Sequence, residues 1–320
     1  MIQLCNGILY DVEGCNYRFD PRRVMPNEVS MISHAHTDHL PTSFKHPAVV
    51  CTPITRDFIK VRRKKDVEVC SDSRVRLFDA GHIAGSSMFL VRAEKNVLYT
   101  GDFCTRKKSS TEGARPQKCD ILITEATYGK PHYVFPEHEE IMSIIRDWLK
   151  DILRRGGSAV LFAYPLGKSQ ELGAAFKDLP MRFHQKIAEN NLVLRRHGYD
   201  LPADEYDHRT STGPVVYVTS GYGGDLARVE HLRKRGAKTA AFSGWALDRD
   251  FIRSSSVDEA FPVSDHCGFD ELTEFVRKCS PEQVFTTHGF AKEFALHVRK
   301  HLGIDAQPLV SRQRTLDHFC

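Results

Sequence analysis

The segment 33–40, SHAHTDHL, holds three histidines and one aspartate within six consecutive positions. In an extended segment the side chains alternate in direction, so His34 and His36 point to the same side and can bind one metal ion. Asp38 and His39 follow as the chain turns, and we expect them to face a neighbouring position. Imidazoles combined with a carboxylate suit zinc, with manganese or iron as substitutes. The alternative, a histidine-rich surface turn, is disfavoured because the segment follows an apolar run.

Two further donors follow this segment in the sequence, each shortly after an expected strand. His82 lies in a glycine-flanked turn, DAGHIAGS, and Asp102 follows an apolar run and a glycine. Strand ends hold side chains on a rigid scaffold at the edge of a sheet, where chemistry is often placed. A Gly-His or Gly-Asp pair alone is an ordinary turn. The interpretation therefore depends on the position of His82 and Asp102 after the segment 33–40 in the sequence.

The ordered set H-x-H-x-D-H, then His, then Asp resembles the metallo-β-lactamase fold of metal-dependent hydrolases. The resemblance implies an αββα sandwich with two divalent metal ions, zinc or manganese, at one sheet edge. Asp20 stands where that family keeps an aspartate that orients a ligand histidine, and Asp11 is the competing candidate. The implied ligands are His34, His36 and His82 for the first metal, Asp38 and His39 for the second, and Asp102 between them.

Three later segments resemble the motifs of the β-CASP nuclease branch of that fold. They are LITEATYG with Glu125, VSDHC with His266, and FTTHG with His288. The resemblance implies that His288 completes the second metal site and that His266, supported by Glu125, protonates the leaving oxygen. It also implies hydrolysis of phosphodiester bonds by a hydroxide activated by two metals. The implied catalytic residues are Asp38, His266, Glu125 and Asp20.

Alternating short strand-like and longer helical segments predict an α/β fold. We expect strands at 7–10, 29–33, 74–78, 87–92, 96–100, 121–124 and 158–164, and a helix at 137–155. The β-CASP arrangement implies a metallo-β-lactamase domain formed by 1–130 and 256–320, with an inserted α/β domain at 131–255.

Polar residues of the inserted segment are candidates for substrate contacts. The stretch that contains Lys168 resembles a Walker loop but lacks its first glycine, so ATP binding is not expected. Tyr222 or Trp245 could stack on a base, and the basic runs 62–65 and 106–108 could follow a phosphate backbone. The other histidines, His197 and His231 among them, are interpreted as surface residues. The candidate substrate contacts are Lys168, Ser169, Ser220 and Ser243.

Within the β-CASP branch, the sequences of the motifs are most similar to those of the ligase-associated DNA exonucleases. These proteins are also labelled as mRNA 3′-end processing factors. The segment 261–276 also resembles the Artemis-type DNA repair nucleases, which lack a histidine at the position of His288. We therefore expect a DNA exonuclease of repair or end processing, with a DNA ligase as a possible partner. RNA 3′-end processing, a small-molecule hydrolase and a non-catalytic nucleic-acid-binding module are the alternatives.

The composition is compatible with this interpretation. The chain of 320 residues is 41% hydrophobic and 27% charged, with a formal net charge of +4, as in an ordinary globular protein. Its nine cysteines form no CxxC pair, which argues against a zinc ribbon and favours thiols in a reducing compartment. No apolar run approaches the length of a membrane span, and we expect a cytoplasmic protein without a membrane partner.

Overall fold

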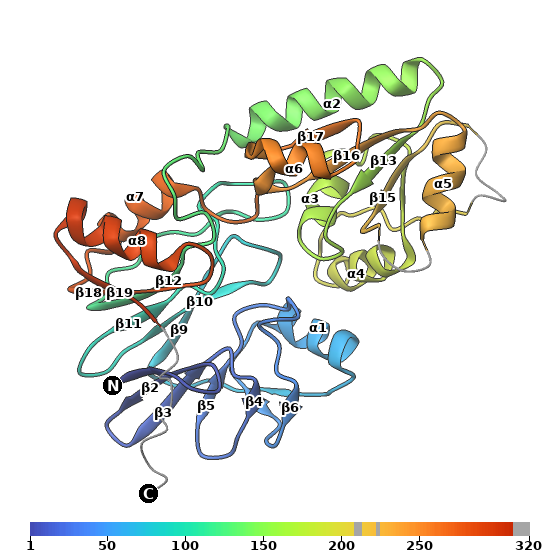
Figure 1. Ribbon diagram of the computed structural model, residues 1–320. Coiled ribbons are helices and arrows are strands. Elements are labelled where there is room, and N and C mark those ends of the chain that lie inside the picture. Colours follow the sequence, from blue (N-terminus) through green and yellow to red (C-terminus); the bar gives the residue numbers. More distant parts are fainter. Residues whose placement is uncertain (208–212, 222–224, 310–320) are drawn as a thin grey trace, which may run out of the picture.

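The computed structural model describes residues 1–207, 213–221 and 225–309, and it is an α/β structure with several sheets (Figure 1). Its largest sheet has the strand order β19-β18-β12-β11-β10-β9. In it β10 runs antiparallel to both of its neighbours, and the other pairs are parallel. The strands are β9 (Val75–Asp79), β10 (Ser87–Val91), β11 (Val97–Tyr99), β12 (Ile121–Glu125), β18 (Gln283–Thr287) and β19 (Asp305–Pro308).

A second sheet is built from the first residues of the chain, in the order β1-β2-β3-β5. The short strand β4 lies between β3 and β5 in the chain and pairs with β6, and the short pair β7–β8 and one helix, α1 (Pro53–Arg63), come after β5. Thr52 caps α1 through its hydroxyl, which accepts a hydrogen bond from the N–H of Thr55. The strands are β1 (Ile2–Leu4), β2 (Ile8–Val12), β3 (Cys15–Phe19), β5 (Val29–Met31), β4 (Arg23–Val24), β6 (Ser43–Phe44), β7 (Ala48–Val49) and β8 (Glu68–Val69).

The alternation of side chains along the strands of the six-stranded sheet supplies two apolar faces. One face packs against the four-stranded sheet, with Phe89, Tyr99 and Ile123 against Phe19 and others. The other face is covered by α7 (Phe269–Cys279) and α8 (Ala291–His297), which continues into η2 (Val298–Leu302). Because both faces are buried, the edge of the sheet is where polar side chains can gather.

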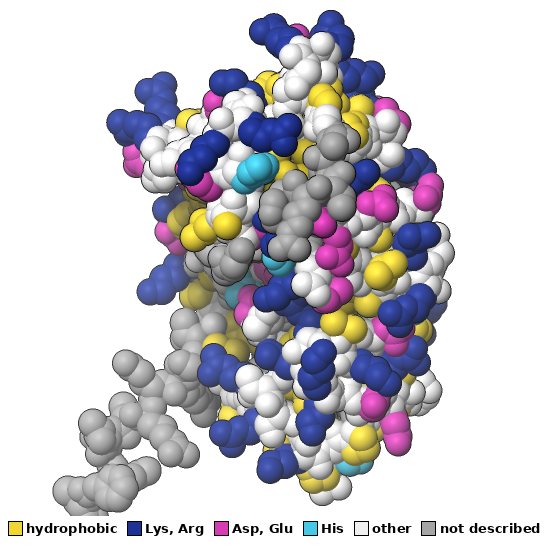
Figure 2. All heavy atoms as spheres, turned by 90° about the vertical axis from the view of Figure 1, so that its right-hand side faces the viewer, with side chains coloured by type: hydrophobic (Ala, Val, Ile, Leu, Met, Phe, Trp, Pro, Cys, Tyr) yellow, Lys and Arg dark blue, Asp and Glu magenta, His cyan; other side chains and the backbone are white. Residues whose placement is uncertain are grey.

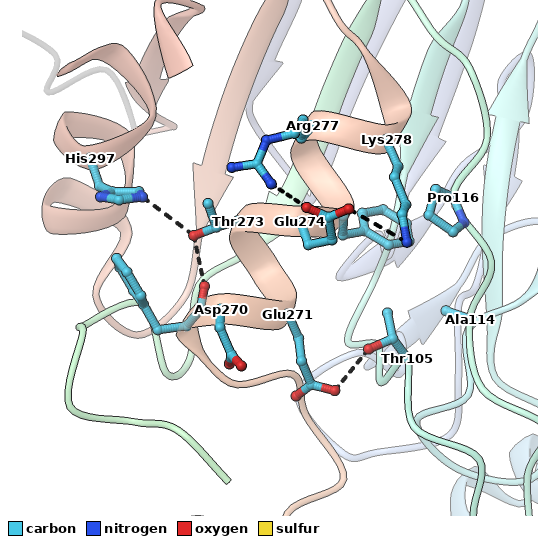
Figure 3. A pocket seen from close by; sticks show the side chains of 12 residues that line it. Thr105, Ala114, Pro116, Asp270, Glu271, Thr273, Glu274, Arg277, Lys278 and His297 are labelled. Carbon is cyan, nitrogen blue, oxygen red and sulfur yellow. Dashed lines mark hydrogen bonds and ion pairs between the residues drawn. The ribbon is translucent and has the colours of Figure 1, made fainter. Parts of the chain in front are cut away.

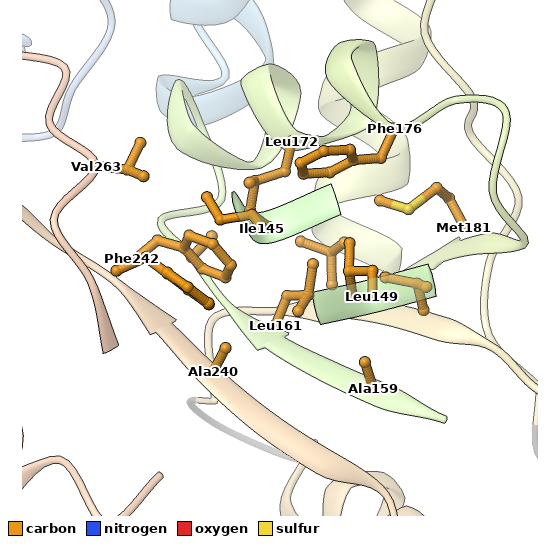
Figure 4. Close-up of a cluster of buried hydrophobic side chains, with 14 of the residues drawn as sticks. Ile145, Leu149, Ala159, Leu161, Leu172, Phe176, Met181, Ala240, Phe242 and Val263 are labelled. Carbon is orange, nitrogen blue, oxygen red and sulfur yellow. The ribbon is translucent and has the colours of Figure 1, made fainter. Parts of the chain in front are cut away.

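A third sheet, parallel throughout, lies between β12 and β18 in the chain, with the order β14-β15-β13-β16-β17. Its strands are β13 (Ala159–Phe162), β14 (Met181–Phe183), β15 (Val216–Thr219), β16 (Lys238–Phe242) and β17 (Glu259–Phe261), and the short helices η1 (Gly244–Leu247) and α6 (Arg249–Ser254) join the last two. On one face Leu161 and Phe242 pack against α2 (His138–Arg154), α3 (Lys168–Ala175) and α4 (Gln185–Arg195) (Figure 4). The other face is covered by α5 (Leu226–Lys234).

The expected α/β class is confirmed, and the predicted strands and helix lie within two residues of the observed ones. β12 and β18 pair in parallel, with Glu125 opposite Thr287, although the whole third sheet separates them in sequence. No helix among the described residues is long and apolar enough to cross a membrane.

Candidate metal centre

The carboxyl ends of parallel strands meet at one edge of the six-stranded sheet. Asp102 follows β11, Glu125 ends β12, and His288 follows β18, and these three strands are adjacent and parallel. The turn that holds His82 lies between β9 and β10 at the same edge. The segment after β5 joins this edge through Ser33, whose carbonyl accepts a hydrogen bond from the N–H of Ser87. Five distant segments of sequence therefore reach one place.

Hydrogen bonds fix which nitrogen of each histidine carries a lone pair. His36 Nε2 donates to the carbonyl of Leu166 at 3.0 Å, which leaves Nδ1 free to bind a metal. His82 Nδ1 donates to the carbonyl of Asp265 at 2.9 Å, which leaves Nε2. The two remaining nitrogens, His36 Nδ1 and His82 Nε2, lie 3.0 Å apart. Two lone pairs that face each other repel, and a cation between them removes that repulsion.

His34 and His39 are oriented through the carboxylate of Asp20. Asp20 Oδ2 accepts hydrogen bonds from His39 Nδ1 at 2.7 Å and from the Ser33 hydroxyl at 2.6 Å. The Ser33 oxygen in turn lies 2.9 Å from His34 Nδ1, which donates to it. Among the described residues the buried Nε2 atoms of His34 and His39 have no hydrogen-bond partner. Buried nitrogens without partners are costly unless an ion binds them.

The carboxylate of Asp102 lies in the middle of these nitrogens. Its Oδ2 is 3.6 Å from His34 Nε2, 3.4 Å from His39 Nε2 and 3.8 Å from His82 Nε2. These distances are too long for hydrogen bonds. They match the separation of about 3.4 Å between two ligands that each lie about 2.0–2.2 Å from one tetrahedral metal ion. Donor atoms of His34, His36, His82 and Asp102 all lie within 4.8 Å of one another. This donor set fits a divalent metal such as zinc.

The lowered pKa values of His34, His36 and His82 also suit a metal. Burial and the neighbouring imidazoles lower the pKa of His34 and of His82 well below the usual value, so both offer lone pairs at neutral pH. Burial also lowers the pKa of His36. His39 differs, because Asp102 and Asp20 outweigh the effect of burial and raise its pKa well above the usual value. Burial raises the pKa of Asp102, but His39, followed by His266 and His34, outweighs burial and holds that pKa well below its usual range.

Asp20 occupies the position that the resemblance implied for an orienting aspartate. Besides His39 and Ser33, it accepts a hydrogen bond from the hydroxyl of Tyr99 at 2.7 Å. Its backbone φ of 43° lies in the left-handed region, which asparagine, aspartate and histidine adopt more often than other residues with a side chain. Asp11, the competing candidate, is exposed on β2 and takes no part in these contacts.

The donors expected for a second metal lie on the solvent side of the same cluster. Asp38 Oδ2 is 3.7 Å from His39 Nε2, and the Asp38 side chain is 73% exposed. The ring of His288 lies 5.3 Å from the ring of His39, centroid to centroid. His288 has a φ of 55°, a strained conformation that clusters at functional sites. The sequence-predicted residues are thus brought together, and the second group is more open than the first.

A charged pair borders the cluster. His266 Nδ1 donates to Glu125 Oε1 at 2.8 Å, and the ring centroids of His266 and His82 are 4.6 Å apart. Burial lowers the pKa of His266, but Glu125, Asp102 and Asp265 outweigh burial and raise it. Glu125 is itself buried at the end of β12, where it also accepts the N–H of Phe103. The arrangement holds a protonated imidazole beside the donors.

A cavity of about 520 Å³ opens over the cluster. Histidines of the cluster, Asp38, Asp102, His266 and His288 line it on one side, and Tyr164, Ser243 and Trp245 of the inserted segment line it on the other. A larger cavity of about 740 Å³ lies outside α7 and is lined by Thr105 and His297, among others (Figure 3). There Glu271 pairs with Thr105 and Glu274 with Arg277 and Lys278, and none of the clustered donors takes part. The clustered donors, and not the size of the cavity, therefore mark the candidate site.

The predicted substrate contacts have different positions. Lys168 and Ser243 line the cavity, whereas Ser169 and Ser220 are not among its described lining residues. Ser169 is fully buried, and its hydroxyl donates to the carbonyl of Tyr164. Tyr222 lies outside the described residues.

A buried ion cluster behind the cavity was not visible in the sequence. Asp265 accepts hydrogen bonds from Lys168 Nζ at 3.0 Å and from Lys108 Nζ at 3.2 Å. The two lysines outweigh burial and hold the pKa of Asp265 well below its usual range. Lys108 also donates to the carbonyl of His82, so the ion cluster braces one of the clustered donors.

The interpretation of the remaining histidines as surface residues is wrong for His138. Its Nε2 donates to Glu171 Oε1 at 2.8 Å, and its side chain is 11% exposed. His197 is also paired, with Asp57 at 2.8 Å. Isolated histidines have no spacing that reveals such partners in the sequence.

Comparisons with known proteins come from sequence and from structure. No family model matches the chain. It is 34% identical over 297 residues to a protein of Opitutus terrae named "Probable DNA ligase", and the match covers 88% of this chain and 28% of the relative. It is 25% identical to "Probable RNase MJ4" of Methanocaldococcus jannaschii, over 81% of this chain and 80% of the relative. It is also 25% identical to "DNA cross-link repair protein SNM1" of Arabidopsis thaliana, over 86% and 61% of the two chains.

The fold is shared with a solved structure. A crystal structure of a protein of unknown function from Enterococcus faecalis V583 superposes with a TM-score of 0.59 at 11% identity, over 89% of this chain and 92% of the other. At that identity the likeness concerns the fold alone.

Proposed function

We propose that this chain, which belongs to the β-CASP family of metallo-β-lactamase-fold nucleases, is itself a metal-dependent nuclease that hydrolyses phosphodiester bonds. The observation that carries this proposal is the gathering of donor atoms from His34, His36 and His82 around the Asp102 carboxylate, beside the imidazole of His266 that Glu125 holds charged. Activity and substrate are proposed, since the chain spans only 28% of the Opitutus relative.

The proposed architecture is an αββα metallo-β-lactamase sandwich formed by 1–130 and 256–320, with a β-CASP domain inserted at 131–255. The sheet order and the position of the five-stranded sheet between β12 and β18 support it. β17 pairs with β16 and ends at Phe261, so we propose to move the end of the inserted domain from residue 255 to Phe261, and the metallo-β-lactamase domain then resumes at Pro262.

We propose two divalent metal ions, zinc or manganese. His34, His36, His82 and Asp102 would hold the first, and Asp38, His39, Asp102 and His288 the second. Metal ions so placed supply an activated water and neutralise charge on the phosphoryl oxygens. The residues of the chain orient the donors: Asp20 orients His39 directly, and it orients His34 through Ser33.

The proposed general acid is His266. Its Nδ1 is held by Glu125, so Nε2 is the atom that can give a proton to the departing sugar oxygen. The raised pKa of His266 keeps that proton in place near neutral pH. Lys168 and Ser243, which line the cavity, are proposed to contact the substrate.

DNA is the proposed substrate, with exonucleolytic processing of ends in repair and a DNA ligase as partner. The likeness to a protein named as a DNA ligase and to one named for DNA cross-link repair supports this choice. RNA processing is the second candidate, and the likeness to a protein named as an RNase favours it. A small-molecule hydrolase of the same fold is the third.

The test is metal-supplemented digestion of end-labelled DNA and RNA, each single- and double-stranded. A shortening ladder on DNA that Asp38→Ala/His39→Ala abolishes supports the proposal and reveals polarity. Selective cutting of RNA moves the protein to RNA processing. If the metal-loaded protein cuts neither DNA nor RNA, the proposal of a nuclease is refuted and the small-molecule hydrolase becomes the favoured alternative.

A companion measurement separates metal binding from nucleic-acid binding. We expect His36→Ala to lose metal in elemental analysis while it retains affinity for an oligonucleotide. The matched control is His46→Ala, which removes an exposed histidine outside the cluster and should retain its metal.

A further inference from the structure

Residues 164–171, with the sequence YPLGKSQE, follow β13 and enter α3. They resemble a Walker loop in sequence, but the proposed function uses only their Lys168. Residues 166–171 are all buried, although four of them are polar or charged. Buried polar groups cost free energy unless each finds a partner, so their partners indicate what this segment holds in place. We call it the 164–171 turn.

Side chains from α3 and α4 fix the backbone of this turn. The Ser169 hydroxyl donates a hydrogen bond to the carbonyl of Tyr164 at 2.6 Å. The side-chain amide of Asn190 donates to the carbonyl of Pro165 at 2.7 Å, and Gln170 Nε2 donates to the same carbonyl at 3.2 Å. The backbone of the turn is therefore held by side chains of the inserted domain on which the five-stranded sheet packs.

Gly167 packs against the loop that carries His82. Its N–H donates to Gln170 Oε1 at 2.7 Å, and its φ of 100° is one that residues with a side chain rarely adopt. A Cβ at this position would lie 2.5 Å from Cγ2 of Ile83, the residue after His82. Glycine therefore lets the turn approach that loop more closely than another residue would.

The 164–171 turn reaches two of the clustered donors. The carbonyl of Leu166 accepts the hydrogen bond from His36 Nε2 at 3.0 Å. Lys168 Nζ donates to Asp265 Oδ2 at 3.0 Å, and the carbonyl of Asp265 accepts from His82 Nδ1 at 2.9 Å. Lysine and arginine side chains are common on the surface (Figure 2), but Lys168 is only 5% exposed. The turn thus holds His36 directly and His82 through one buried ion pair.

The last residue of the turn, Glu171, holds a second loop in place. Its carboxylate accepts hydrogen bonds from the backbone N–H groups of Ser109 and Ser110, each at 2.9 Å. Lys108, directly before them, donates to the carbonyl of His82 at 2.7 Å. Both the ring and the backbone of His82 are therefore linked to the turn.

Apolar packing follows the same connections. Leu166 belongs to one buried cluster with Ala35 and Ile83. Ala35 directly precedes His36, and Ile83 directly follows His82 in the chain. Because buried side chains are closely packed, a shift of the turn would be felt at both histidines.

We propose that the 164–171 turn positions His36 and His82 for the first metal ion, so that metal affinity depends on a segment of the inserted domain that contributes no ligand. This inference rests on the proposed metal-dependent function and deepens it, with Gly167 and Gln170 as positioning residues. Coupling between two sites is reciprocal, so metal binding must also stabilise the turn.

The test is the affinity of the metal-stripped protein for Zn²⁺, measured by competition with a chromophoric chelator. Gln170→Met keeps the length of the side chain but loses its hold on Pro165 and Gly167, and it should lower the affinity about tenfold. Gly167→Ala, which pushes the turn away from Ile83, should lower it at least as much. With Co²⁺ bound, both variants should show shifted visible absorption bands, which a merely less stable fold would not shift.

The matched control is Thr239→Val, which removes another buried hydrogen bond of the inserted domain. The Thr239 hydroxyl donates to Asp258 Oδ2 at 2.7 Å, and Thr239 pairs with Val160 at the far end of β13 from the turn. This variant should bind Zn²⁺ within about twofold of the wild type. Equal losses in Thr239→Val and Gln170→Met would overturn the inference, since they would reflect stability alone.

Hydrogen exchange measures the reciprocal effect. In the wild type, Zn²⁺ should slow exchange in peptides covering 164–171 by about fivefold or more, and much less in peptides covering α5. Exchange in 164–171 that does not respond to Zn²⁺ would contradict the inference.

The same binding series separates this inference from the proposed function. If the wild type binds Zn²⁺ and both turn variants bind it equally well, the role of the turn is refuted and the nuclease is untouched. If the wild type binds no metal, the inference and the metal-dependent nuclease are refuted together.

Discussion

His266 Nδ1 donates to Glu125 Oε1 at 2.8 Å, a bond that joins positions 141 residues apart at the edge of the six-stranded sheet. The other ring nitrogen, Nε2, remains for the substrate, and His266 lines the cavity over the metal centre. A carboxylate that holds a cationic imidazole in one orientation is the arrangement expected of a general acid.

The first prediction concerns the leaving group. His266→Ala should slow cleavage of an oligonucleotide by about 10²–10⁴-fold, because its alkoxide leaving group needs a proton. Hydrolysis of bis(p-nitrophenyl) phosphate should fall far less, since p-nitrophenolate leaves without one. Glu125→Gln should lower the pKa of His266, so the alkaline limb of the pH–rate profile should move to lower pH. Equal losses on both substrates would exclude His266 as the acid.

The second prediction concerns the orienting carboxylate. Asp20→Asn keeps the shape of the residue but weakens its hold on His39 and Ser33. Metal affinity should fall by about 10- to 100-fold, measured by competition with a chromophoric chelator. Asp11→Asn, at the exposed competing position, is the control and should bind metal as the wild type does. Unchanged affinity in Asp20→Asn would contradict the orienting role.

The third prediction concerns the buried ion cluster. Asp265→Asn leaves the ammonium groups of Lys108 and Lys168 buried without their anion, so the free energy of unfolding should fall by about 3–5 kcal/mol in urea denaturation. Lys107→Ala breaks an exposed ion pair with Glu112 in the same loop and should cost less than about 1 kcal/mol. Similar losses in both variants would mean that burial of the cluster has no energetic consequence.

The fourth prediction concerns acid stability. Burial raises the pKa of Glu171, but hydrogen bonds from His138 and Ser110 and the charge of Lys108 outweigh burial and lower the pKa to about 2. A carboxyl with a lowered pKa stabilises the fold above its unfolded pKa of about 4.3, and this stability is lost as pH falls toward 2. Glu171→Gln should therefore be less stable at pH 7 and should lose less stability between pH values of about 4.3 and 2. Parallel stability curves for the two proteins would refute this linkage.

The segment 33–40 is the part of the candidate site that sequence alone determined. In 33–40 the spacing of His34 and His36 places two imidazoles on one side because side chains alternate along an extended chain. Local periodicity also predicted the strands that precede His82 and Asp102 and, at helical spacing, the helix at 137–155. Where the position of a side chain depends on residues close to it in the sequence, the spacing of those residues predicts that position.

The tertiary structure decided what holds those residues in place. The carbonyls of Leu166 and Asp265, which decide which ring nitrogen of His36 and of His82 keeps its lone pair, come from segments more than a hundred residues away. Every residue has a carbonyl, so no residue type marks these two. The partners of Lys168 and His138 were equally hidden, since a buried ion pair forms only where folding brings two chain segments together. The sequence thus determined which donors are present, and the packing of three sheets decided where each one points.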